Sequence, residues 1–168
     1  IPNPVSVKSA GGRLNLNDVK QIIIPEKNKG VKKIAEFYIR ALNQSDIKII
    51  ETKSPHTSSK KSIILQLLSG ENSSDYYTLN SSKNGIKITA SQERGLFYAL
   101  QSLIQIIEKS EGQNNITNLS IPYINIEDDS RFKYRGLHLD VSRHFFPVSF
   151  IKNYIDMMAK YKYNYFHW

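Results

Sequence analysis

Residues 131–168 constrain the fold most strongly, because they predict a strand, a helix and a second strand in turn. Strands are expected at Tyr134–Val141 and Asn164–Trp168, on either side of a helix at about Ser149–Tyr161. Four apolar residues give the helix its i, i+3, i+4, i+7 spacing: Ile151, Tyr154, Ile155 and Met158. Two strands joined by a crossover helix run parallel, and a parallel pair is too small for a stable domain. We therefore expect this unit to begin a larger parallel α/β structure that continues beyond Trp168.

Residues 1–128 predict a separate α+β domain. Apolar and β-branched runs indicate six short strands: Val19–Ile24, Ile47–Glu51, Ser62–Leu68, Tyr76–Asn80, Ile86–Ala90 and Ile121–Ile126. Helical apolar spacing marks Val31–Asn43 and Gln92–Lys109, and the Asn84-Gly85 pair predicts a hairpin turn. Polar loops are expected at Lys53–Lys61 and Gly112–Asn118. This order favours one sheet with both helices on one face, with the second domain at residues 129–168.

The composition narrows the classes of partner and chemistry. The net charge of +8 raises nucleic acid as a partner, but the lysines are scattered through loops and exposed helix positions rather than clustered. Cysteine is absent, which excludes disulfides and cysteine-based metal sites or nucleophiles. The four histidines lie far apart in the sequence, so no metal site is expected. No apolar run approaches the ~20 residues of a membrane span, and the first residues do not form a signal peptide.

The run Arg131-Phe-Lys-Tyr-Arg-Gly-Leu-His-Leu-Asp-Val-Ser-Arg-His-Phe-Phe-Pro147 resembles the opening of the catalytic barrel of glycoside hydrolase family 20, the β-N-acetylhexosaminidases. The continuation through Ile151–Ala159 and Lys162–Trp168 keeps the resemblance in register. The helix around Gly95–Gln105 is similar to the last helix of that family's preceding domain. The resemblance implies a noncatalytic α+β domain followed by the first β-α-β of a TIM (β/α)₈ barrel, and no cofactor.

In such barrels the active site lies at the carboxyl ends of the strands. Arg135 begins the first strand, where a structural ion pair is expected. Arg143 follows the end of the same strand, and the resemblance implies that it holds hydroxyls of the terminal sugar. A guanidinium suits this role because it presents several donors in a fixed fork. The alternative is that Arg143 forms an ion pair with Asp140 or a later carboxylate for structure alone.

Other residues near these strand ends are weaker candidates. Asp140 is expected to fix Arg143 or its loop, and His144 can act as a general base in principle, although packing in the loop is the commoner role. His138 is expected in the barrel wall. His167 and Trp168 end the second strand near the site, and Trp168 is a candidate for lining it.

The resemblance implies substrate-assisted hydrolysis with retention, in which the sugar's acetamido oxygen attacks and an Asp-Glu pair assists. No Asp-Glu dipeptide occurs in the sequence, so no catalytic residue is assigned and the isolated chain is expected to be inactive. The family's His-x-x-x-Asp-Asp stretch would begin at about His167 and run past Trp168. The acidic run Glu127-Asp128-Asp129 precedes the barrel and is expected to be a solvated linker or a helix-strand cap.

The expected function is therefore hydrolysis of terminal non-reducing β-linked N-acetylglucosamine or N-acetylgalactosamine by the longer protein. The expected partner is an N-acetylhexosamine-containing glycan, and family habit favours a secreted or periplasmic location. The alternative is a noncatalytic glycan-binding or adaptor module that uses the α+β domain. A nucleic-acid binder, the third reading, predicts a clustered basic face and steep salt dependence.

Overall fold

The structure, a computed structural model, describes residues 2–53, 61–70, 73–111 and 117–168. These residues divide into two compact units. One unit is Pro4–Asp129, and the other is Ser130–Trp168 together with the first three residues of the chain. The loops predicted at Lys53–Lys61 and Gly112–Asn118 lie largely outside the described residues.

The first unit is built on one mixed sheet of eight strands. They are β1 (Ser6–Asn15), β2 (Gln21–Pro25), β3 (Lys48–Thr52), β4 (Ser62–Leu67), β5 (Tyr77–Ser82), β6 (Gly85–Ala90), β7 (Glu108–Glu111) and β8 (Thr117–Asp128). The order across the sheet is β1-β8-β5-β6-β4-β2-β3, and β7 pairs with β8. Neighbours among β2, β3, β4 and β6 are parallel, whereas β5, β8, β1 and β7 pair in antiparallel fashion.

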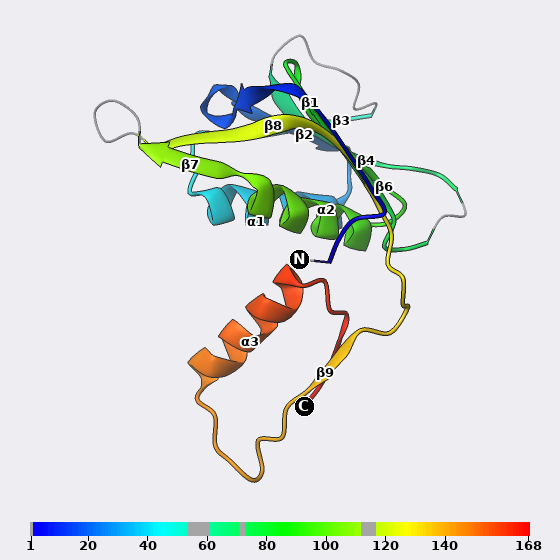
Figure 1. The fold of residues 1–168 in the computed structure, drawn as a ribbon, viewed down its shortest axis with the longest axis vertical. Helices are drawn as coiled ribbons and strands as arrows, with labels where there is room; N and C mark the ends of the chain where they lie inside the picture. The colour runs from blue at the N-terminus through cyan, green and yellow to red at the C-terminus, as the bar shows by residue number, and fades with distance from the viewer. Residues whose placement is uncertain (1, 54–60, 71–72, 112–116) are drawn as a thin grey trace. The chain divides into compact units, whose positions relative to one another are not determined.

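Helices α1 (Lys29–Leu42) and α2 (Glu93–Ile106) cover the same face of this sheet, as predicted (Figure 1). The two helices contact each other, and α1 contacts β2 while α2 contacts β4, β5 and β6. The Asn28 side chain accepts a hydrogen bond of 2.9 Å from the amide of Val31 and caps the first turn of α1. Asn43, with a φ of +54°, ends the helix in the left-handed conformation.

The core lies between the sheet and the two helices. Alternate residues of the central strands point into it and are fully buried: Ile22, Ile24, Ile63, Leu65, Tyr77, Leu79, Ile86 and Ile88. The helices meet them with buried apolar residues at helical spacing, among them Val31, Ala35, Tyr38, Leu96, Ala99, Leu100 and Leu103. Buried apolar residues thus recur at every second position in the strands and about every 3.6 positions in the helices, and together they form one continuous apolar layer.

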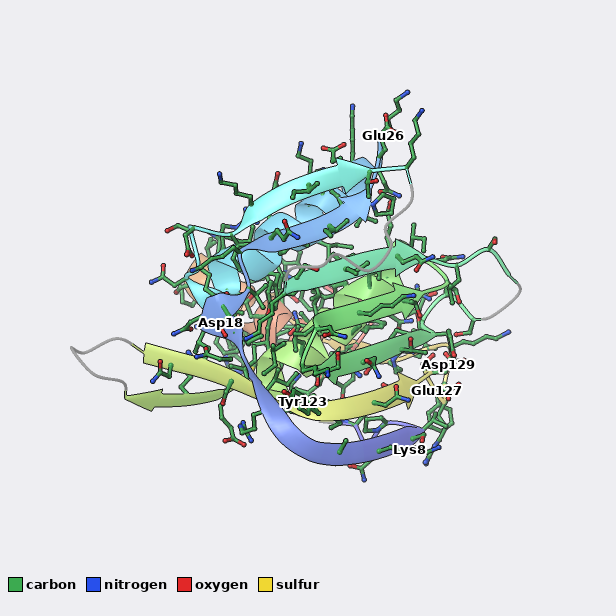
Figure 2. All side chains as sticks on the ribbon, turned by 90° about the horizontal axis from the view of Figure 1, so that it is seen from above. Lys8, Asp18, Glu26, Tyr123, Glu127 and Asp129 are labelled. Carbon is green, nitrogen blue, oxygen red and sulfur yellow. The ribbon has the colours of Figure 1, made fainter. Side chains whose placement is uncertain are left out.

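Two strands, β1 and β7, were not predicted from the sequence. Figure 2 shows β1, with Lys8, beside β8, which carries Tyr123 and ends near Glu127 and Asp129. The β1–β8 register shifts between Ser9 and Arg13, where Gly12 has a φ of +111° and the Tyr123 ring takes the space of a Cβ. The glycine therefore bends the strand at a bulge rather than ending it.

The acidic run at the end of β8 is not a solvated linker, which corrects the prediction. Asp128 is buried with 7% exposure and accepts a hydrogen bond of 2.9 Å from the hydroxyl of Tyr77. Glu127 accepts a hydrogen bond from Tyr76, and Asp129 accepts one from Ser73. The prediction was wrong because the strand continues to Asp128 and turns this carboxylate inward, where a buried charge requires partners.

The second unit is a parallel β-α-β, as predicted. It comprises β9 (Gly136–His138), α3 (Val148–Lys160) and β10 (Tyr165–His167), in the register Gly136–Tyr165, Leu137–Phe166 and His138–His167. Both strands are shorter than predicted, since a turn at Asp140 follows β9 closely. Met158 is buried, but Ile155, expected to be buried, is 47% exposed.

Candidate functional site

The segment that follows β9 is organised by the carboxylate of Asp140. One oxygen, Oδ1, accepts hydrogen bonds from the amide and the hydroxyl of Ser142, at 2.8 and 2.7 Å, and from the amide of Arg143 at 3.4 Å. These bonds close a local turn of the kind that aspartate side chains favour. They also hold the pKa of the Asp140 carboxyl below its ordinary value, with the Ser142 hydroxyl as the largest cause.

Arg143 is exposed at the tip of this turn. Its backbone amide is held by Asp140, whereas no ion pair joins its guanidinium to a carboxylate in the described part of the chain. The guanidinium is therefore available as a set of donors at the carboxyl end of β9. The sugar-holding role of Arg143 and the loop-fixing role of Asp140 stay predictions that this geometry is compatible with.

His144, the other candidate in the loop, is exposed. Because it follows the Asp140 turn, it lies at the same end of β9 as Arg143. A general base must reach the proton that it removes. Its role stays a prediction.

Arg135 lies at the opposite end of β9, where a structural ion pair was expected and backbone carbonyls are found as hydrogen-bond acceptors. Its guanidinium donates hydrogen bonds to the backbone carbonyls of Lys162, at 2.7 Å, and Phe132, at 2.6 Å. Asn164 completes this end of the unit, since its side chain accepts from the Arg135 amide and donates to the Lys133 carbonyl. Arg135 and Arg143 are thus separated by the length of the strand, as their positions predict.

A histidine pair that the sequence did not reveal lies at the carboxyl ends of the two strands. The Nδ1 atoms of His138 and His167 are 3.1 Å apart, and the rings meet edge to face with centroids 4.6 Å apart. Both imidazoles are exposed. The two histidines lie far apart in the sequence and were not expected to meet. The register between the two strands brings them together. The matching positions of the two histidines, each two residues after the start of its strand, become visible only once the structure fixes those starts at Gly136 and Tyr165.

A row of aromatic rings connects α3 with the strands. Phe146, Phe150 and Tyr154 stack in sequence, and Tyr154 packs against Phe166 with ring centroids 5.5 Å apart. Phe166 in turn stacks on Trp168, at 6.1 Å. Trp168 is 71% exposed and lies at the same strand ends as Arg143. That it lines the site stays a prediction.

Among the described residues, no cluster of three or more histidine, cysteine or acidic side chains is arranged to hold a metal ion. None of the helices in the described ranges has the length and apolar character that crossing a membrane requires.

The carboxyl end of β9 thus carries an exposed arginine on a turn that the Asp140 carboxylate holds. The fold of both units matches one enzyme family. The model described as "Glycosyl hydrolase family 20, domain 2" matches residues 1–129, and the model described as "Glycosyl hydrolase family 20, catalytic domain" matches residues 132–168. The chain belongs to glycosyl hydrolase family 20 and comprises its domain 2 and the start of its catalytic domain.

Curated relatives carry the same assignment. The chain is 40% identical over 94 residues to a β-hexosaminidase of Porphyromonas gingivalis, a match that covers 55% of this chain and 12% of that protein. It is 36% identical over 107 residues to a β-hexosaminidase of Akkermansia muciniphila, covering 61% of this chain and 21% of the relative. The chain therefore spans a small part of the length of these relatives.

Solved structures agree along nearly the whole chain. A mutant β-hexosaminidase of Streptomyces plicatus in complex with its product, N-acetylglucosamine, superposes with a TM-score of 0.82 at 30% identity, over 99% of this chain and 33% of that one. The β-N-acetylhexosaminidase of Bacteroides fragilis gives a TM-score of 0.77 at 28% identity, and the chain covers 31% of it. The predicted fold class is thereby confirmed.

Proposed function

We propose that the protein to which this chain belongs is a β-N-acetylhexosaminidase. It removes terminal non-reducing β-linked N-acetylglucosamine or N-acetylgalactosamine from glycans by substrate-assisted hydrolysis with retention. The observation that carries the proposal is the likeness to the Streptomyces plicatus enzyme bound to N-acetylglucosamine, at 30% identity over 99% of this chain. It covers the turn of Asp140 and Arg143 as well as the whole first unit.

Arg143 is the residue of this chain that we assign to the substrate. Its exposed guanidinium lies at the carboxyl end of β9, where barrel enzymes hold their ligands, and its planar set of N–H groups fits two neighbouring sugar hydroxyls. Asp140 accepts a hydrogen bond from the amide of Arg143 and so helps to hold the backbone from which this side chain extends. Hydrogen bonds to such hydroxyls hold the sugar ring while its acetamido group reacts.

The 168-residue chain has no Asp-Glu pair. We therefore expect it to be inactive when produced alone, with activity only in the full-length protein. The test is hydrolysis of chromogenic β-N-acetylglucosaminide and β-N-acetylgalactosaminide by both forms. If the full-length protein hydrolyses neither sugar, the proposal is contradicted and a noncatalytic glycan-binding module is favoured. If the 168-residue chain hydrolyses either sugar, the expectation that it is inactive is wrong.

The role of Arg143 is tested in the same assay with Arg143→Ala and Arg143→Lys. Loss of a charge-assisted pair of hydrogen bonds lowers kcat/KM by roughly 100-fold or more in the alanine variant. Lysine keeps the charge but loses the planar fork, so we expect an intermediate effect. Unchanged kcat/KM in both variants would remove Arg143 from the substrate site.

A further inference from the structure

The His138–His167 pair lies on a defined side of the two-stranded sheet. Leu137 and Phe166, the preceding residues, are half-buried on the side of α3, where Phe166 packs against Tyr154. Because side chains alternate along a strand, His138 and His167 point to the opposite side. In a (β/α)₈ barrel the side away from the helices is the interior, and these residues stand near its catalytic end.

His167 is joined to β9 by two separate bonds. Its imidazole meets His138 with Nδ1 atoms 3.1 Å apart, and its backbone carbonyl accepts a hydrogen bond of 3.0 Å from the amide of Leu139. From the other side of the sheet, the hydroxyl of Tyr154 donates to the carbonyl of His138 at 3.3 Å. The end of β9 is therefore held on both faces.

Asp140 comes directly after this held segment. Its carboxylate accepts from the amides of Ser142 and Arg143 and so sets the turn that presents the guanidinium. His167 thus contacts His138, Asp140 follows His138 by two residues along the backbone, and Asp140 in turn accepts from the amide of Arg143. Displacing the end of β9 displaces the turn, because the two are adjacent in the backbone.

We propose that His138 and His167 form a positioning pair, which joins the carboxyl ends of the first two barrel strands and thereby sets the Asp140–Arg143 turn for the sugar. The inference rests on the proposed function, since it assigns the pair to the sugar-holding role of Arg143. Neither histidine is given a contact with the substrate.

The pair depends on a single shared proton. Two Nδ1 atoms at 3.1 Å form a hydrogen bond only when one ring carries its proton on Nδ1 and the other presents a bare nitrogen. When both rings are protonated, two N–H donors face each other and the bond is lost. The neighbouring titratable groups are the Asp140 carboxylate, whose charge interacts with His138, and the Tyr154 phenol on α3.

The experiment uses the full-length protein with His138→Leu and His138→Gln, measured with a chromogenic β-N-acetylglucosaminide at pH 7. Leucine at position 138 occupies the barrel wall but cannot form the hydrogen bond to His167. For His138→Leu we therefore expect KM to rise roughly five- to tenfold at pH 7, the contribution of one net hydrogen bond, while kcat stays within about twofold. The glutamine amide can both donate to a neutral His167 and accept from a protonated one. His138→Gln therefore keeps the wild-type KM at pH 7.

Rescue by glutamine separates positioning from packing, because glutamine restores a hydrogen bond to His167 whereas leucine occupies the site without one. A His138→Leu variant with the wild-type KM overturns the inference, and so does a His138→Gln variant with the KM of His138→Leu. In either case, hydrolysis by the wild type leaves the proposed function intact. If the wild type neither hydrolyses the substrate nor binds N-acetylglucosamine in calorimetry, the proposed function fails, and the positioning role fails with it.

Discussion

The hydroxyl of Tyr77 lies 2.9 Å from the carboxylate of Asp128 and 2.8 Å from the hydroxyl of Ser102. This contact joins β5, the end of β8 and α2 inside the first unit. Tyr77 is 1% exposed, and burial raises the pKa of its phenol well above the ordinary value. The last residues of β8 are thus fixed from within the core, close to the point where the first unit ends.

Tyr77→Phe should destabilise the chain by about 1–3 kcal/mol, because it removes a donor from a buried carboxylate and leaves a buried serine with one bond fewer. Urea unfolding of the 168-residue chain, followed by circular dichroism, measures the change. Equal stability of variant and wild type would mean that water replaces the tyrosine at Asp128.

Tyr38→Phe is the matched comparison, and the opposite result is expected. Tyr38 is fully buried in α1, but its hydroxyl has no hydrogen-bond partner among the described residues. Removing an unsatisfied buried hydroxyl restores free energy lost to desolvation, so the variant should be as stable as the wild type or more stable by about 1 kcal/mol. A loss comparable to that of Tyr77→Phe would reveal an unseen partner for Tyr38.

Gly85→Ala should destabilise the chain by about 2 kcal/mol or more. Gly85 has a φ of +131° at the start of β6, and a Cβ there would collide with the backbone of Ser62 on β4. Gly30→Ala is the control, since in α1 the atoms nearest to an added Cβ belong to the carboxylate of Glu93, at the end of a flexible side chain. Helix propensity favours alanine there, so its effect should stay within about 1 kcal/mol in the same unfolding assay.

Ser142→Ala should raise the pKa of the Asp140 carboxyl toward its ordinary value, because the Ser142 hydroxyl is the largest cause of the lowering. A lowered native pKa means that the turn is stabilised above the ordinary carboxyl pKa and loses that support as pH falls through the lowered value. Carbon-detected NMR titration of Asp140 in wild type and variant measures the shift. An unchanged titration would mean that the backbone amides alone hold the carboxylate.

Local patterns in the sequence account for most of the fold. Helices α1 and α2 and strands β2, β4 and β6 follow from apolar periodicity, since each buries one continuous face. Strands β1 and β7 lack that signal. In β1 the Gly11-Gly12 pair lies at a bulge, where Gly12 packs against Tyr123. The partners of an edge strand come from tertiary pairing, which local composition does not encode.

The candidate site also combines residues that local sequence could place with residues that it could not. Arg143 and Asp140 could be placed from the motif and the strand-end rule, because both are local to one strand and its turn. The His138–His167 pair could not, because it depends on the register between strands separated by α3. The inward turn of Asp128 likewise depended on β8 continuing beyond Ile126, the predicted end.

The central claim, that this chain belongs to an enzyme whose substrate supplies its own acetamido nucleophile, is tested most directly by a pair of substrates. The full-length protein is given a chromogenic N-acetyl-β-glucosaminide and the matching β-glucoside, which lacks the acetamido group, and proton NMR identifies the first anomer released. We predict turnover of the N-acetylated sugar alone, with the β-anomer formed first. Comparable turnover of the plain glucoside, or release of the α-anomer, would contradict the account.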